Sequence, residues 1–334
     1  MKLSLTLEIE LSMIPTLEKH QRILIAPLHW GFGHATRCIP IIHHLISLEK
    51  DVAIAGDNAS FAMLQRRYPT LTSFELPSYK VRYGNSLTLS MFLQGPRLIA
   101  TYRKELKEVD RIVKEWQPDV IISDNRFGVR HKDTHNIYLT HQLNIQHKKK
   151  SIALFANLLH RRFIHQFDEC WIPDNKERDL SGRLSDSSEI RIPCKCIGAL
   201  SRIKLSLEDP TIELLVLLSG PEPSRTKFEE SIISNESLSQ RIVCIVRGTD
   251  SKRLKNYPAN FTIHNIVDQE ELTSFINTSA AILCRSGYST IMDLQDYDRP
   301  KYYIPTKGQT EQEYLAEYHD GKKGVKVLKN GQNI

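Results

Sequence analysis

The sequence contains no long apolar run. No stretch approaches the roughly 18 consecutive apolar residues that a membrane-spanning helix needs. The first twenty residues also lack the apolar segment of a secretory signal peptide, because "LSLTLEIEL" alternates apolar and polar residues and includes Glu8 and Glu10. Residues 1–20 are therefore taken as an N-terminal extension, either an extra edge strand or an upstream start that adds little.

The number of cysteines and the net charge are also modest. The chain has six cysteines among 334 residues, and only Cys194 and Cys196 lie close together. Without a second pair or a neighbouring histidine, this pair is a poor zinc site. Cysteines inside apolar strands indicate reduced, buried thiols in a cytoplasmic protein. The net charge is +6 and the pI is near 8.9. This balance suits an anionic ligand or a contact with an anionic membrane surface, but it is too weak to predict nucleic-acid binding.

The first half of the chain alternates strand and helix patterns, which is typical of a parallel α/β sheet. The apolar run "QRILIA" predicts a strand at 21–26, and a glycine-bearing loop leads from it into a helix. A longer helical pattern follows later, and the dipeptide Gly95-Pro96 predicts a break in it. The predicted strands are 21–26, 51–56, 71–76 and 118–124, and the predicted helices are 35–50, 59–68 and 86–116.

A second series of the same kind begins after the polar stretch at 199–210. We therefore predict an α/β fold of two facing doubly wound, Rossmann-like domains, at 21–200 and 201–334. A ligand is expected in a cleft between the carboxyl ends of their strands. The predicted strands of the second series are 212–218, 241–246, 261–264, 280–283 and 301–304, and its helices are 224–234, 269–277, 288–295 and 309–319.

The stretch "CRSGYSTIMDL" at 284–294 places polar residues where a strand becomes a helix. Free N–H groups at a helix start form a natural anion site, and Gly287 allows close approach of the backbone to a phosphate. Ser286 and Arg285 would add a hydroxyl donor and a positive charge. Asp293, further along the helix, has the chemistry to hold the paired hydroxyls of a ribose. An ordinary strand–helix turn with a solvated aspartate is the alternative.

The stretch "PTKGQTEQEYLAEY" is a second loop of this kind. Gln309 and Gln312 are three residues apart at a predicted helix start, so they share one face of the helix. Neutral amides there can bond sugar hydroxyls without repelling a phosphate. A single surface glutamine carries no such meaning, but together the two loops fit a nucleotide with a sugar attached.

The stretch "HWGFGHATR" follows the first strand. Gly31 and Gly33 allow a tight turn, and His34 near the helix start is suited to accept a proton at neutral pH. A purely structural turn is the alternative. The third glycine of a dinucleotide fingerprint is absent, which argues against a nicotinamide-dependent oxidoreductase. Asp124, at the end of the predicted strand 118–124, would orient His34, replace it as the base, or merely cap a turn.

Together these stretches resemble the nucleotide-sugar glycosyltransferases of the GT-B type, in particular the MurG-like family 28 group. "CRSGYSTIMDL" with the pattern P-x-x-x-Q-x-x-Q-x-x-x-A is similar to the donor signature of that family, and "GFGHATRCIP" is similar to its N-terminal glycine-rich loop. The resemblance spans residues 21 to 328. The residues of the second pattern are Pro305, Gln309, Gln312 and Ala316.

The resemblance implies an inverting transferase that takes a sugar from a nucleoside-diphosphate donor, commonly UDP-linked, with no obligatory metal or cofactor. Two departures from the family occur: Asp293 stands where the family has a glutamate, and Pro221 and Pro223 remove N–H donors from the first glycine-rich loop of the C-terminal half. Arg225 would supply charge there instead. The donor-binding residues implied are Ser219, Gly220, Arg225, Ile266, Val267, Arg285, Ser286, Gly287, Asp293, Gln309 and Gln312.

The acceptor is not named by the sequence, and a glycan, a lipid-linked sugar or a small molecule all fit. "SLTLSMFLQGPRLIATYRK" at 86–104 mixes apolar and basic residues, which suits either core packing or a peripheral contact with a membrane. His131, His135 and His141 are interpreted as surface or acceptor-side residues. The remaining alternatives are a nucleotide-sugar hydrolase or epimerase of the same fold, and a non-catalytic nucleotide-sugar-binding partner subunit.

Overall fold

A computed structural model describes residues 19–79, 87–206, 208–251, 256–329 and 332, with the backbone alone at 87–93. The edge strand suggested within the N-terminal extension lies outside these residues, as do the first side chains of the 86–104 stretch. The chain divides into two compact units, of which the first ends at Arg202 and the second begins at Ile203. Each unit is described by itself.

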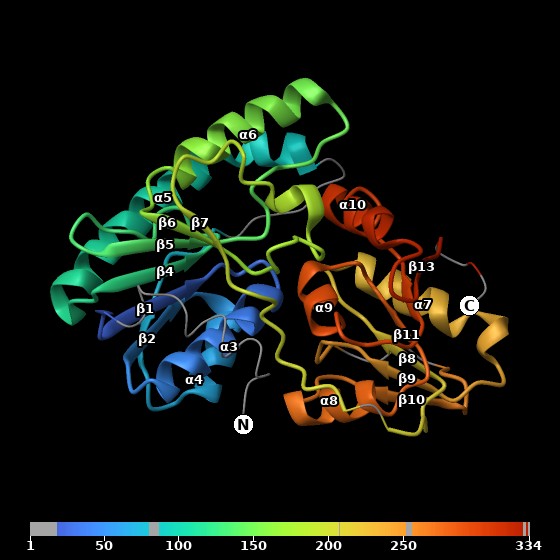
Figure 1. Cartoon of the computed structure of the whole chain (residues 1–334). Helices are drawn as coiled ribbons and strands as arrows, with labels where there is room; N and C mark the ends of the chain where they lie inside the picture. Colours follow the sequence, from blue (N-terminus) through green and yellow to red (C-terminus); the bar gives the residue numbers. More distant parts are fainter. Residues whose placement is uncertain (1–18, 80–86, 207, 252–255, 330–331, 333–334) are drawn as a thin grey trace. The chain divides into compact units, whose positions relative to one another are not determined.

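The first unit is built on a parallel sheet in which the described strands follow the order β3-β2-β1-β4-β5-β6-β7 (Figure 1). The order reverses between β1 and β4, and ligands of doubly wound sheets bind outside the carboxyl ends of strands at such a point. The register pairs Pro27 with Asp124, so the two strands end side by side. The strands are β1 (Arg22–Pro27), β2 (Asp51–Gly56), β3 (Thr72–Glu75), β4 (Val120–Asp124), β5 (His135–Leu139), β6 (Glu169–Ile172) and β7 (Cys194–Cys196).

Helices cover both faces of this sheet. Figure 1 shows α3 (Gly33–Ser47) and α4 (Asn58–Arg67) on one face, and α5 (Leu87–Trp116) and α6 (Lys150–Ile164) on the other. This division follows from right-handed crossovers that run in one direction along the sheet from β1 to β3 and in the opposite direction from β3 to β6. A short 3₁₀ helix, η1, spans Gly182–Ser185. The core beneath α5 joins its Val109, Ile112 and Trp116 to Leu24, Ala26, Ala53, Ala55 and Ile121 of the strands.

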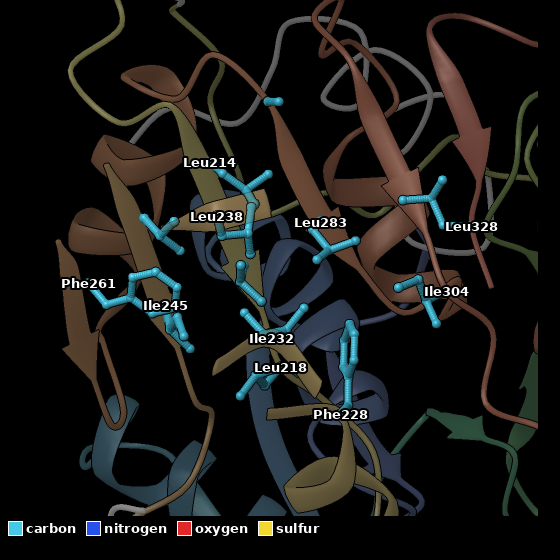
Figure 2. Close-up of a cluster of buried hydrophobic side chains, with 13 residues drawn as sticks. Leu214, Leu218, Phe228, Ile232, Leu238, Ile245, Phe261, Leu283, Ile304 and Leu328 are labelled. Atoms are coloured by element: carbon cyan, nitrogen blue, oxygen red, sulfur yellow. The ribbon is translucent and has the colours of Figure 1, made fainter. Parts of the chain in front are cut away.

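The second unit repeats the same topology, with the described strands in the order β10-β9-β8-β11-β12-β13. Its reversal lies between β8 and β11. Figure 2 shows the core, in which Phe228 and Ile232 of α7 join Leu214, Ile245 and Leu283 of the strands. The strands are β8 (Leu214–Leu217), β9 (Val243–Val246), β10 (Phe261–His264), β11 (Ile282–Cys284), β12 (Lys301–Tyr303) and β13 (Val325–Val327). The helices are α7 (Ser224–Ile233), η2 (Glu236–Leu238), α8 (Gln269–Asn277), α9 (Tyr288–Asp293) and α10 (Thr310–His319).

The predicted α/β fold with two doubly wound parallel sheets is confirmed. The predicted break at Gly95-Pro96 is wrong, because α5 continues through both residues. Proline removes one backbone N–H from a helix, and the packing of the later turns of α5 on the sheet keeps the helix continuous despite that loss. Helix α6, which begins at Lys150, was not predicted from the sequence.

Candidate functional site

The loop after β1 is fixed by hydrogen bonds on both sides. His29 Nδ1 lies 2.7 Å from Ser60 Oγ, and the Ser60 hydroxyl donates to the Gly31 carbonyl at 3.0 Å. Gly31 has a φ of +87°, in the left-handed region that favours glycine, and open space lies where a Cβ would stand. Gly33 is the first residue of α3. The loop therefore holds His34 on the first turn of that helix.

His34 is paired with Asp124. Its Nδ1 lies 2.9 Å from Asp124 Oδ1, and the carboxylate, at the end of β4, is fully buried. The His34 side chain keeps 15% of its surface exposed. If Nδ1 carries the proton and donates a hydrogen bond to Asp124, the free lone pair of the imidazole is on Nε2. A buried carboxylate that fixes the tautomer of a partly exposed histidine is the arrangement of a general base and its orienting group.

Arg37, one turn further along α3, completes this cluster and was not predicted from the sequence. Its Nε donates to Asp124 Oδ2 at 2.7 Å, and its Nη2 donates to Oδ1. The same Nη2 lies 2.9 Å from His34 Nδ1, so a second arrangement exists in which Nδ1 accepts from Arg37 and Nε2 carries the proton. General-base chemistry requires the first arrangement. A sequence signal was available, because arginine three residues after His34 shares its helix face.

His141 lies at the far side of the same cluster. Only 6% of it is exposed, and Arg37 Nη1 donates to its Nδ1 at 3.0 Å. The surface alternative for His141 is therefore wrong, and its interpretation as an acceptor-side residue stays a prediction. It follows β5, which lies beside β4 in the sheet, so the fold places it among the buried residues at the carboxyl ends of the strands.

The electrostatics of the cluster keep Asp124 ionised. Burial acts to raise the pKa of this carboxyl, but the positive charge of Arg37, and next to it His34, lowers the pKa well below its usual range. Cys38 lies 3.7 Å from Asp124 Oδ2, and burial followed by that carboxylate raises the pKa of its thiol. Asp124 is thus a buried anion whose two carboxylate oxygens already take part in hydrogen bonds. Its geometry suits orienting His34 better than taking a proton from a substrate.

In the second unit, the loops after β11 and β12 meet at the carboxyl edge of the sheet. The Ser286 hydroxyl donates to the Gln312 carbonyl at 2.8 Å, and Gln312 Oε1 accepts from the Thr306 N–H at 2.9 Å. Gln309 is the N-cap residue of α10. Gly287 is the N-cap residue of α9, and the space where its Cβ would stand is open. The structure therefore brings the predicted residues of these two loops together.

Arg285 lies beneath these loops with only 2% of it exposed. Its Nη1 donates to the carbonyls of Ile304 and Pro305 at 3.0 and 3.3 Å, and its guanidinium stacks 4.0 Å from the centre of the Phe228 ring. The Nε is buried without a partner, and no ion pair joins Arg285 to a carboxylate in the described parts of the chain. Burial lowers the pKa of Arg285 to about 10, so the side chain stays charged at neutral pH. The charge is therefore buried and uncompensated, rather than projecting from the loop.

The loop after β8 carries Ser219 and Gly220, which are both exposed. Gly220 has a φ of +99° and open space at its Cβ position. Arg225, by contrast, is buried: it pairs with Glu222, and its Nη2 donates to Ser251 Oγ at 3.2 Å. Burial lowers the pKa of Arg225. Its charge is thus already balanced by a carboxylate, unlike the charge of Arg285.

Three other predicted donor residues lie on two further elements. Ile266 is 54% exposed and Val267 is half-buried, both in the loop after β10. Asp293 is half-buried and is the last residue of α9, because this helix ends two residues before the predicted boundary at 295. The carboxylate therefore lies at the end of a six-residue helix.

The opposite, amino edge of the first sheet holds a cavity of about 580 Å³. It is lined by Asp119, which precedes β4, and by His131, whose Nε2 lies 3.4 Å from Asp110 Oδ1. This cavity is therefore at the other end of β4 from Asp124.

Among the described residues, no group of three or more His, Cys, Asp or Glu side chains could hold a metal ion. None of the described helices is both long and apolar enough to cross a membrane.

Comparison with protein-family models gave no match. Among curated proteins, the chain is 23% identical over 329 residues to an uncharacterized glycosyltransferase of Methanosarcina acetivorans, covering 88% of this chain and 82% of that protein. A similar protein of Methanosarcina mazei, also named an uncharacterized glycosyltransferase, is 22% identical over 323 residues with the same coverage.

Solved structures share the fold at low sequence identity. The glycotransferase of kitacinnamycin has a TM-score of 0.64 at 14% identity, and covers 94% of this chain and 87% of its own. The glycosyltransferase SnogD from Streptomyces nogalater has a TM-score of 0.63 at 13% identity, with 94% and 88% covered. The spinosyn rhamnosyltransferase SpnG, complexed with thymidine diphosphate, has a TM-score of 0.61 at 12% identity, with 92% and 86% covered.

These comparisons confirm the GT-B fold, and with the names of the two relatives they support a glycosyltransferase enzyme. The narrower resemblance to the MurG-like group stays a prediction.

Proposed function

We propose that this protein is an inverting, metal-independent glycosyltransferase that moves a sugar from a nucleoside-diphosphate donor to an acceptor hydroxyl. The observation that carries the proposal is the pairing of His34 with the buried Asp124 at the reversal point of a GT-B-type sheet. We take a UDP-sugar as the first donor to test and the MurG-like group as the nearest functional analogy. The enzyme would work in the cytoplasm, with no role for nucleic acid.

In this proposal His34 is the general base. Its Nε2 takes the proton from the acceptor hydroxyl as the oxygen attacks the anomeric carbon, and the Asp124 carboxylate stabilises the imidazolium that forms. Proton transfer by a positioned base contributes typically about 10²- to 10⁴-fold to the rate. Attack by this oxygen on the face opposite the leaving nucleotide inverts the anomeric centre.

The donor would bind at the carboxyl edge of the second unit. N–H groups at the start of α9, which follows the N-cap residue Gly287, and the uncompensated charge of Arg285 would stabilise the negative charge that grows on the leaving diphosphate. Removing one preorganised donor of this kind typically costs about 3 kcal/mol of transition-state stabilisation. These groups fill the role that a divalent cation has in metal-dependent transferases.

The remaining predicted residues would contact other parts of the donor. We assign Gln309 and Gln312 to the sugar hydroxyls, Asp293 to the ribose, and Ile266 with Val267 to the base. Two structures of the same fold support a nucleotide donor, because SpnG is complexed with thymidine diphosphate and Arabidopsis thaliana UGT89C1 with UDP-L-rhamnose. Both nucleotides therefore belong in the first screen.

The acceptor side would include two exposed aromatic rings. Trp30 is 46% exposed and Phe32 is 40% exposed, and they flank Gly31 in the loop that carries His34. Exposed aromatic rings stack on sugar rings or on apolar aglycones. A glycan, a lipid-linked sugar and a small molecule all fit this surface, and a lipid-linked acceptor would add a peripheral contact with a membrane.

The test is a thermal-shift screen against nucleotide sugars, followed by product analysis with labelled donor. A ligand that binds only the folded protein raises its melting temperature. The proposal expects at least one nucleotide sugar to do so, and expects transfer of its label to an acceptor with inverted configuration. Free labelled sugar without acceptor would indicate a hydrolase, an isomerised donor would indicate an epimerase, and binding without turnover over a broad acceptor screen would indicate a non-catalytic partner subunit.

A further inference from the structure

Helix α6 presents a row of large apolar side chains to solvent. Leu154, Phe155 and Leu158 are 72%, 70% and 67% exposed, and Leu159 is 47% exposed. Figure 1 shows α6 along the outside of the first unit, next to α5. A surface helix normally turns a polar face to water, and contiguous apolar patches on soluble proteins mark interaction sites.

The four residues form one stripe, because positions three, four and five apart lie on neighbouring parts of a helix surface. The opposite side of α6 packs on the unit: Ile164 is buried, and Phe163 stacks on Phe127 with ring centres 4.9 Å apart. Both sides of the helix therefore carry apolar side chains. The described residues cover one side and leave the stripe exposed.

Basic residues stand at both ends of this stripe. Lys148, Lys149 and Lys150 are exposed at the start of α6, and Arg162, exposed near its end, lies on the same face as Leu158 and Leu159. The chain around the helix contains no acidic residue from position 134 to position 167. A carboxylate does reach α6 from outside that stretch, because Glu189 pairs with Arg161 at 3.0 Å.

We propose that this face of α6 docks on the surface of an anionic lipid bilayer. An apolar helix face flanked by lysine and arginine lies in the interface of a membrane, with the apolar side chains between the lipids and the cations on the head groups. Two copies of the protein would instead bring like charges at the ends of the stripe close together, which disfavours self-association. The prediction of a membrane contact by the 86–104 stretch concerns side chains that lie partly outside the described residues, and it stays a prediction.

The test is co-sedimentation of the full-length protein with vesicles of phosphatidylcholine alone or mixed with phosphatidylglycerol. We expect binding to the anionic vesicles, weaker binding at high salt, and little binding to the neutral ones. Leu158→Ser should reduce the bound fraction, whereas the matched control Ile242→Ser, at a 54% exposed site in the second unit, should not. Lys149→Gln with Lys150→Gln should weaken binding by roughly 30-fold, at about 1 kcal/mol per charge.

Lys323→Gln with Lys326→Gln is the control for charge, because it removes two exposed lysines from the second unit. If both double lysine variants lose the same amount of vesicle binding, the proposal is overturned, because the binding is then general electrostatic attraction. So would equal binding by Leu158→Ser and wild type. A melting temperature that falls by many degrees in Leu158→Ser would show that the stripe packs within the protein, and a dimer in light scattering that Leu158→Ser dissociates would show that a second copy covers it. Vesicle binding needs no turnover, so this result is independent of the transferase proposal.

Discussion

Arg37 donates hydrogen bonds to both carboxylate oxygens of Asp124. This pair is buried on both sides, with 4% of Arg37 and none of Asp124 exposed. The guanidinium holds the carboxylate in one orientation, and the carboxylate in turn holds the imidazole of His34. The candidate base is therefore fixed by a residue that need not touch the substrate itself.

Asp124→Asn tests the orienting role of the carboxylate. The amide keeps the shape of the side chain but loses the charge that stabilises an imidazolium, so we expect turnover to fall by about 10²- to 10⁴-fold. The donor-induced rise in melting temperature should be unchanged, because the proposed donor residues are in the second unit. Asp110→Asn is the control, since Asp110 pairs with Lys114 on α5 and is 46% exposed. Similar turnover in the two variants would contradict the role.

Arg37→Ala tests the ion pair that Arg37 forms with the Asp124 carboxylate. Removing one partner of a buried ion pair leaves an uncompensated charge, and we expect the free energy of unfolding to fall by about 3–5 kcal/mol. Arg37→Lys keeps the charge but cannot form the bidentate hydrogen bonds to Asp124, so its turnover should lie between that of wild type and that of Arg37→Ala. Added guanidinium ion at low concentration should restore part of the turnover of Arg37→Ala, which a loss of folding alone would not allow.

The control for Arg37 is Arg111→Ala. Arg111 is 52% exposed on α5 and pairs with Glu108 and Glu115. Exposed pairs of this kind contribute about 0–1 kcal/mol each. If urea unfolding shows that Arg37→Ala lowers the free energy of unfolding no more than Arg111→Ala does, the proposed role of the Arg37–Asp124 pair is contradicted.

The stability of the protein should depend on pH through Asp124. Its pKa is lowered in the folded state relative to about 3.9 in an unfolded chain, so its ionised form favours folding. That contribution is complete above the unfolded pKa and is lost as the pH falls through the lower folded value. We therefore expect the stability advantage of wild type over Asp124→Asn to shrink from about pH 4 downward. A constant difference between pH 6 and pH 3 in urea unfolding would contradict this.

Arg285→Met tests the buried charge of the second unit. Methionine keeps an apolar contact with Phe228 but removes the cation, so the donor-induced rise in melting temperature should be lost. Arg299→Met is a matched control, because Arg299 also donates to backbone carbonyls, those of Asn277 and Ser279, at the amino edge of the same sheet. Both variants should lower the melting temperature without ligand, and only Arg285→Met should abolish the response to donor. An equal response to donor in both variants would contradict the assignment of Arg285.

The sequence predicted most of the fold, because buried parallel strands are short apolar runs bounded by turn residues. The runs at 21–26, 51–56 and 118–124 correspond to β1, β2 and β4 within two residues. Helix α6 was missed although its sequence has the 3.6-residue period of a helix. That period does not show which face is outward, and the structure turns large apolar side chains of α6, such as Leu158, to solvent.

The site was predicted in part. His34 and Asp124 were both identified from their places at strand ends, and the register of β1 and β4 brings them together. Arg37 was missed because its significance depends on a partner 87 residues away, and local pattern does not reveal which buried carboxylate an arginine meets. Arg285 was identified as a charge near the phosphates, but the sequence did not show that backbone carbonyls and Phe228 would hold it below the loop.

The central claim is that His34 takes the proton from the acceptor. The most direct measurement compares wild type with His34→Ala for sugar transfer from a donor found in the thermal-shift screen, with the donor-induced shift recorded for both proteins. We predict that turnover falls by about 10²- to 10⁴-fold while the donor-induced shift persists. Equal turnover in His34→Ala and wild type would contradict the claim, since the proton would then leave through another group.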